Sequence, residues 1–98
     1  MTLHEFQELV EGIYFERDNA RGVAGTFMWF LEEVGELARA LRADDRENLS
    51  EEFADVLAWL STLASISGVR LRDAARRYAD GCPYCGHAPC TCPRTNKP

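Results

Sequence analysis

Carboxylates recur in this chain at a spacing that could bind a metal ion. The segment EEVGELARAL, Glu32–Leu41, is nearly repeated nineteen residues later as EEFADVLAWL, Glu51–Leu60. At about 100° per residue, each segment places two acids on one helical stripe beside the core. The stripes are Trp29, Glu33, Glu36 and Ala40 in the first segment, and Asn48, Glu52, Asp55 and Trp59 in the second.

The two stripes can face one another if their helices pack antiparallel, as a short connection requires. Four grouped carboxylates repel and become protonated unless a positive charge compensates them. Oxygen-only ligands suit a hard divalent cation, Mg²⁺ first and Mn²⁺ second. Such a cation keeps several waters, which leaves room for phosphate oxygens. The alternative is a solvated acidic surface, although neither stripe carries the lysines at i+4 that a salt-bridged surface would have.

At these residues the sequence resembles the MazG-like, all-α nucleoside triphosphate pyrophosphohydrolases. Their signature is E-E-x-x-E followed at a distance by E-x-x-D, and here it comprises Glu32, Glu33, Glu36, Glu52 and Asp55. The resemblance implies a helical bundle, usually a dimer or a dimer of dimers, that hydrolyses NTP or dNTP to the monophosphate and pyrophosphate with Mg²⁺. It also implies that Glu33, Glu36, Glu52 and Asp55 bind the metal. Glu32 would be the catalytic residue that orients or deprotonates the attacking water.

The residues that would hold the nucleotide differ from the family pattern. Family members generally add lysines or an asparagine after the acidic motifs, but this chain has no lysine before Lys97. Arginines must therefore serve, and the available cluster is Arg72, Arg76 and Arg77, of which we select Arg76 and Arg77. Arg17 and Arg21 are a second candidate clamp. An equally good interpretation of the Arg72 to Arg77 cluster is a solvated, basic helix end that has no part in substrate binding.

Two tryptophans lie within the acidic stripes. Aromatic residues at helical spacing are most often core residues. Because Trp29 and Trp59 share their stripes with the carboxylates, we assign them to the base of the bound nucleotide.

The C-terminal tail carries a second group of metal-ligand residues, in the sequence CPYCGHAPCTC. Cys82, Cys85, Cys90 and Cys92 could form a tetrahedral, structural Zn²⁺ site, and C-P-x-C-G resembles the knuckle of zinc-ribbon modules. The closing C-x-C is tight for such a site, so His87 is an alternative ligand. C-P-Y-C also resembles the glutaredoxin active site, although that motif needs a βαβ scaffold. Disulfides are disfavoured in the cytosol.

The elements that must position these residues are helices. Thr2 and Glu5 stand at capping-box spacing and predict the start of a first helix at Leu3, which should end at the turn residues DNARG, between Asp18 and Gly22. Apolar periodicity predicts a second helix from Gly25 or Thr26 to Arg42. A third is expected from after Asn48 or Ser50 to Ser67, and a fourth over Leu71–Ala79. No strand-like alternation occurs in residues 1–80. We predict an all-α, antiparallel four-helix bundle over residues 1–80 and a separate cysteine-rich module over residues 81–98.

Composition limits the partners. All 16 acids but only 9 of the 11 bases lie in residues 1–80, which disfavours duplex nucleic acid. The longest uncharged run, Val56–Val69, is shorter than the roughly 20 residues that span a bilayer, and no signal-peptide pattern is present. We therefore expect a cytoplasmic protein without a membrane segment. The same run is apolar on more than one face, which predicts an obligate homodimer.

Two functions from different classes follow. The first is a Mg²⁺-dependent nucleoside triphosphate pyrophosphohydrolase, acting in nucleotide metabolism on canonical or noncanonical nucleotides. The second is a non-catalytic, zinc-tailed helical interaction or adaptor domain whose acids bind a cation only for stability. All five signature acids are present, which favours the enzyme because a stability role has no use for Glu32.

Overall fold

Three α-helices and one 3-10 helix form the chain in the computed structural model, which describes residues 1–94. The helices are α1 (Leu3–Ala43), α2 (Arg46–Ile66), α3 (Leu71–Ala75) and the 3-10 helix η1 (Arg76–Tyr78). No strand occurs within these residues. The prediction of an all-helical chain is confirmed.

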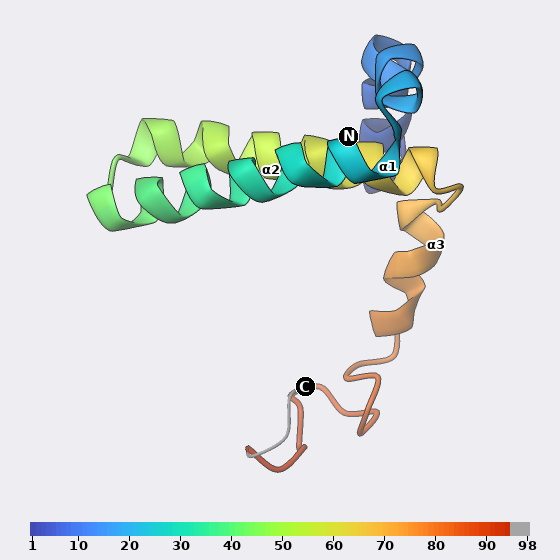
Figure 1. Cartoon of the computed structure of the whole chain (residues 1–98). Coiled ribbons are helices and arrows are strands. Elements are labelled where there is room, and N and C mark those ends of the chain that lie inside the picture. Colours follow the sequence, from blue (N-terminus) through green and yellow to red (C-terminus); the bar gives the residue numbers. More distant parts are fainter. Residues whose placement is uncertain (95–98) are drawn as a thin grey trace.

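A sharp bend divides α1 into two segments. The helix starts with the expected capping box, in which Thr2 Oγ1 accepts from the Glu5 amide and Glu5 Oε1 accepts from the Thr2 amide. Gly22 then adopts φ 86° and ψ 172°, a conformation that favours glycine, and the chain turns across the end of the following helices (Figure 1). The predicted break before Gly22 is confirmed, but helix lies directly on both sides of it instead of a loop.

The second segment of α1 pairs with α2 through a tight turn. Asp44 lies in the left-handed region at φ 52°, and Asp45 caps α2 by accepting the Asn48 amide at 3.3 Å. The predicted start of this helix after Asn48 or Ser50 is wrong, because Asp45 caps it earlier. The two helices run antiparallel side by side (Figure 1). This arrangement turns the two acidic motifs toward each other.

Polar contacts fix the first segment of α1 against the far end of α2. Gln7 is fully buried, and its Nε2 donates to Ser65 Oγ at 3.1 Å and to the Val69 carbonyl at 2.9 Å. Its Oε1 accepts from the Leu71 amide at 2.8 Å. Arg70 adds a two-pronged ion pair with Glu11, at 2.7 and 3.2 Å. These bonds hold the N-terminal segment, the end of α2 and the start of α3 together.

The expected four-helix bundle is not seen in residues 1–94 of one chain. The first segment of α1 crosses the end of the α1–α2 pair, and α3 is too short to form a fourth full helix of a bundle (Figure 1). The physical reason is the bend at Gly22. The sequence pattern predicts where this bend lies but not the direction in which the chain leaves it.

Much apolar surface consequently stays exposed. The described core has only three buried apolar residues, Val10, Ala40 and Leu49. Along the α1–α2 pair, the large side chains left exposed include Phe27, Leu31, Val34 and Leu41 on α1 and Phe53, Leu57 and Leu60 on α2. Across residues 1–94, none of the helices combines the length and hydropathy needed to span a bilayer.

Candidate functional site

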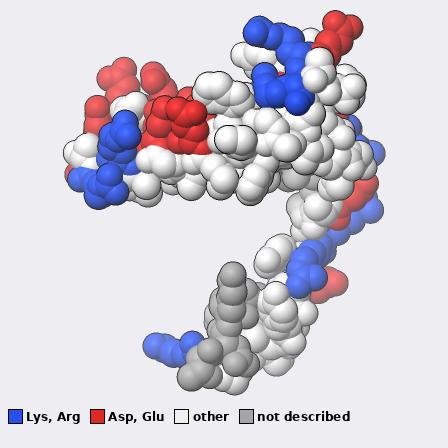
Figure 2. Space-filling model, in the orientation of Figure 1, with Lys and Arg blue, Asp and Glu red and all other residues white. Residues whose placement is uncertain are grey.

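Three acids from the two motifs converge between α1 and α2. One carboxylate oxygen from each of Glu33, Glu36 and Glu52 lies within 4.8 Å of the others. Acidic side chains gather on this part of the helical pair, toward the α1–α2 turn (Figure 2). Glu33 Oε2 and Glu52 Oε2 are buried, and neither has a hydrogen-bond partner among residues 1–94. Buried carboxylate oxygens are costly without a partner, so this group is suited to receive a cation.

Crowding and burial shift the acidity of the cluster. Burial, followed by the negative charges of Glu36, Asp55 and Glu52, raises the pKa of Glu33 from 4.5 to about 7. The pKa of Glu52 is also raised, first by burial and then by the charges of Glu36 and Asp55. The site therefore favours a proton or a metal ion over bare carboxylates.

Asp55 and Glu32 lie outside this group of three. Asp55 is exposed and lines a neighbouring cavity of about 250 Å³. Its charge reaches the cluster, since it raises the pKa of Glu33. Glu32 is exposed, as expected for a residue on another side of the helix. Its catalytic role stays a prediction.

The cavity beside Asp55 is formed by the first segment of α1 and by α2. The charged and aromatic side chains in its lining are Tyr14, Arg17, Asp18, Arg21, Asp55 and Trp59. Trp59 stacks against Trp29, with ring centroids 6.3 Å apart and an interplanar angle of 17°. Arg21 lies over the Trp59 ring, with its Cζ 5.1 Å from the centroid. The structure thus brings both predicted tryptophans together at one end of the acidic site.

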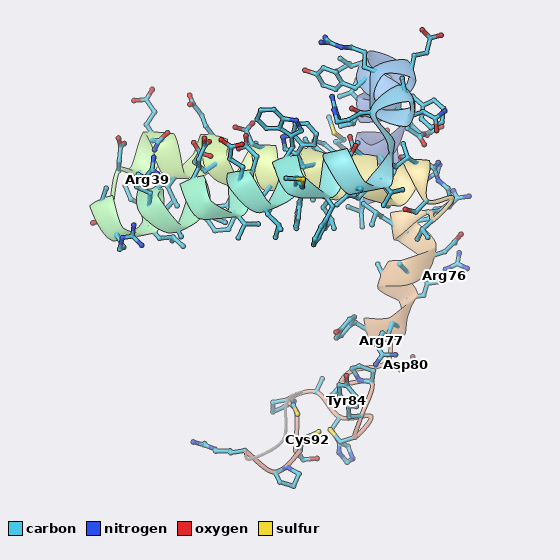
Figure 3. The ribbon with its side chains drawn as sticks, in the orientation of Figure 1. Arg39, Arg76, Arg77, Asp80, Tyr84 and Cys92 are labelled. Carbon is cyan, nitrogen blue, oxygen red and sulfur yellow. The ribbon has the colours of Figure 1, made fainter. Side chains whose placement is uncertain are left out.

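The two arginines selected from sequence lie elsewhere in this chain. Arg76 pairs with Asp73 at 3.6 Å, and Arg77 lies over the ring of Tyr84 at 5.4 Å. Both belong to η1, at the other end of the molecule from Arg39 (Figure 3). Their role in substrate binding stays a prediction.

Sequence reasoning missed two residues beside the acids. Arg39 lines a shallow hollow together with Glu36 and Glu52. Asp18 is 5% exposed, pairs with Arg21 at 3.1 Å and accepts from Thr62 Oγ1 at 3.0 Å. The turn composition of DNARG predicts that Asp18 lies at the end of a helix, whereas the structure places it within the first segment of α1. Its helical spacing of three from Arg21 was the signal that could have identified the pair.

The four tail cysteines form a second cluster. Their sulfurs lie within 4.8 Å of one another, and the thiols are not joined in disulfides. Cys82 Sγ is 3.7 Å from Cys92 Sγ, and Cys85 Sγ is 3.9 Å from Cys90 Sγ. The Thr91 amide donates to Cys85 Sγ and the Cys92 amide to Cys90 Sγ, each at 3.3 Å.

Backbone hydrogen bonds shape the acidity of these thiols. Bonds from Thr91 lower the pKa of Cys85 to about 5, and those from Cys85 and Tyr84 lower the pKa of Cys82. The Cys90 thiol and burial raise the pKa of Cys92 to about 12. His87 uses its Nδ1 in a 2.7 Å bond with Thr91 Oγ1, so it does not join the sulfur cluster through that atom.

Comparison with known families decides the identity of the helical part. The model of the MazG nucleotide pyrophosphohydrolase domain matches residues 21–81, which is more than half of the chain. The chain belongs to the MazG family. The matched MazG region contains both acidic motifs, Trp29 and Trp59, whereas Tyr14, Arg17 and Asp18 of the cavity precede it. The cysteine cluster follows it. No curated protein matches the chain.

The acidic site fits the divalent cation that MazG membership suggests. Its donors are carboxylate oxygens only, and two of them are buried without a partner in residues 1–94. This donor set suits Mg²⁺ or Mn²⁺ and is poor for zinc or copper.

Proposed function

We propose that this MazG protein hydrolyses nucleoside triphosphates, NTP or dNTP and canonical or noncanonical, to the monophosphate and pyrophosphate. The observation that carries the proposal is the convergence of Glu33, Glu36 and Glu52 on one point, with two buried oxygens lacking partners in residues 1–94. The MazG match over residues 21–81 supports the reaction class.

In this mechanism the chain's own residues position the substrate and the water. Glu33, Glu36, Glu52 and Asp55 would hold Mg²⁺, with Mn²⁺ as a substitute. When bound, this ion neutralises phosphate oxygens and acidifies a coordinated water. Glu32 orients or deprotonates the attacking water. Trp29 has the more exposed indole of the pair and offers its face to the base.

A panel of NTPs and dNTPs with Mg²⁺ or Mn²⁺, assayed for pyrophosphate and monophosphate, tests the proposal. Glu36→Gln and Asp55→Asn each remove charge with little change in volume, so each should abolish turnover while circular dichroism remains helical. Turnover retained in both variants would remove these residues from the metal site. No turnover across the panel would favour the adaptor function instead.

We also propose that the protein is an obligate homodimer, with dimers of dimers as a larger assembly. Phe53, Leu57 and Leu60 form an exposed stripe on α2, and Phe27, Leu31 and Val34 form another on α1. Large apolar side chains exposed at successive turns of paired helices are typical of an interface. The radius of gyration, 15.8 Å, exceeds the roughly 13 Å of a compact 100-residue domain, in part because of the tail. A second copy would bury the stripes and help close the nucleotide pocket.

For the tail we propose one structural Zn²⁺ bound by Cys82, Cys85, Cys90 and Cys92. A tetrahedral site with Zn–S bonds of about 2.3 Å separates its sulfurs by about 3.8 Å. The distances of 3.7 and 3.9 Å agree with that spacing. Four protein ligands leave no open position, so this ion has no catalytic part. Two further statements stay predictions. One is the division of the chain into residues 1–80 and 81–98, and the other is a cytoplasmic location.

A further inference from the structure

Arg21 is held in one position by contacts on several sides. Its Nη1 lies 3.1 Å from Asp18 Oδ1 and 3.4 Å from Thr26 Oγ1. Its Cζ lies over the face of Trp59. Arg21 is an exposed residue, and 28% of its side chain is still exposed, so these contacts restrain it without closing it off from solvent. An ion pair, a hydrogen bond and an aromatic contact together therefore fix the position of its guanidinium.

The anchor of Arg21 is itself buried and doubly bonded. Asp18 sits at 6% side-chain exposure, and its second oxygen accepts from Thr62 Oγ1 of α2. Thr26 is fully buried and Thr62 nearly so. The pair therefore links both segments of α1 to α2 at the bend. Removing one partner of such a pair leaves a buried polar group unsatisfied.

Glycine at position 25 makes room for the stem of this arginine. A Cβ built on Gly25 would lie 2.9 Å from Arg21 Cγ and 3.4 Å from Cδ. The nearer distance is shorter than packing allows, and Cγ is too close to the backbone to move freely. Gly25 lies inside a helix, where glycine is less favourable than alanine by about 1 kcal/mol. The aliphatic part of the Arg21 side chain occupies the space that an alanine methyl group at position 25 would need.

The guanidinium of Arg21 lies at the cavity lined by Asp55, one of the residues proposed to hold the metal ion. Arg21, Arg17 and Asp55 line the same cavity of about 250 Å³. Arg17 forms no ion pair in the part of the chain that the structure describes, and Arg21 shares only one nitrogen with Asp18. Guanidinium nitrogens that remain free beside a carboxylate-held cation are suited to bidentate contacts with the phosphate oxygens that the cation does not contact.

We infer that Arg21 binds the pyrophosphate portion of the substrate, and that buried Asp18 and the gap at Gly25 position it. Asp18 and Gly25 act through Arg21 and do not touch substrate. The inference rests on the proposed function for its substrate class. It explains how a chain without a lysine in residues 1–94 recognises a polyphosphate, and it assigns that contact to Arg21, the first residue of the MazG match.

Titration calorimetry with inorganic pyrophosphate and Mg²⁺ tests the inference without requiring turnover. We expect Arg21→Gln to weaken pyrophosphate binding by about 10- to 100-fold, as for loss of a charge-assisted hydrogen bond. Arg21→Lys should restore only part of it, because an ammonium lacks the forked geometry. Arg46→Gln is the matched control, since Arg46 is 81% exposed at the start of α2, and it should bind as wild type.

Gly25→Ala separates positioning from folding. The added methyl group should displace Arg21 and so weaken pyrophosphate binding several-fold, raising KM more than it lowers kcat. It should lower the melting temperature only modestly, because Asp18 loses its contact with Arg21 but keeps the bond from Thr62. Asp18→Asn should also weaken pyrophosphate binding, and it should lower the melting temperature more, because it removes one charge of a buried pair.

Wild-type pyrophosphate affinity in both Arg21→Gln and Gly25→Ala would overturn the inference. A wild-type chain that hydrolyses NTP but binds no pyrophosphate at millimolar concentration would also overturn it, with the proposed function intact. Arg21-dependent pyrophosphate binding without hydrolysis of any nucleotide would support it and reject the proposed function.

Discussion

Replacing Glu33 with glutamine should stabilise the metal-free protein at alkaline pH. A carboxyl whose pKa rises from 4.5 in water to about 7 in the fold binds a proton more tightly when folded than when unfolded. The folded state therefore holds more protons between these two values, and its stability falls as pH rises through that window. Glutamine has nearly the same shape as the protonated acid and does not titrate. The penalty should vanish in the variant.

The magnitude follows from the width of the window. A change from 4.5 to about 7 corresponds to at most about 3 kcal/mol at pH 8. Screening at a site that water still reaches reduces this to about 1–2 kcal/mol. For a chain of this size the gain is about 5–10 °C in melting temperature. At pH 4 the two proteins should melt together, because Glu33 is then protonated in both folded and unfolded chains.

Thermal unfolding of both proteins in EDTA, at pH 4 and pH 8 and at one fixed protein concentration, provides the measurement. Adding Mg²⁺ at pH 8 should raise the melting temperature of wild type more than that of Glu33→Gln. Glu32→Gln is the control, since Glu32 is exposed and lies outside the three-carboxylate group. Its effect should stay within about 0.5 kcal/mol.

Equal melting temperatures of wild type and Glu33→Gln at pH 8 in EDTA would refute the reasoning, as would a stabilisation that persists at pH 4.

The protonation of Glu33 should also affect activity. At low Mg²⁺, kcat/KM should fall as pH drops below about 7, because the proton and the metal compete for Glu33. Raising Mg²⁺ should move that acid limb to lower pH.

Two further outcomes follow from the surfaces outside the acidic site. Leu57→Glu places a charge on an apolar side chain that is exposed in the single chain, so it should dissociate the dimer without unfolding the helices. Arg42→Glu, also at an exposed position of the α1–α2 pair, is the control and should leave the dimer intact. Light scattering that finds wild type monomeric and active at micromolar concentration would contradict the dimer. The tail should carry about one zinc per chain by native mass spectrometry, lost in Cys85→Ser, with turnover only indirectly reduced. Zinc-free protein with rapidly reactive thiols would instead favour the redox reading of CPYC.

The sequence alone was sufficient for features that depend on local spacing. Helical periodicity places Glu33 and Glu36 on one face of a helix, and the tertiary structure adds Glu52 from the next helix by a short turn. The capping box at Thr2 was readable because it needs only residues three apart. The cysteine cluster likewise forms within eleven residues of tail. In each case the partners are too close along the chain for the rest of the fold to separate them.

Tertiary structure decided what depends on the direction of the bend at Gly22. A glycine marks where a helix can break, but the angle is set by distant contacts such as those of Gln7 with Val69 and Leu71. That angle brings Asp18 against Thr62, forty-four residues away, and turns a stretch with turn composition into the buried anchor of Arg21. Separately, the chain turns at Gly68, where φ is 74°, and α3 and η1 run away from the acidic site with Arg76 and Arg77 (Figure 3). Residue types and periodicity fix the face of each helix, whereas the crossing of helices is fixed by long-range packing that no local pattern encodes.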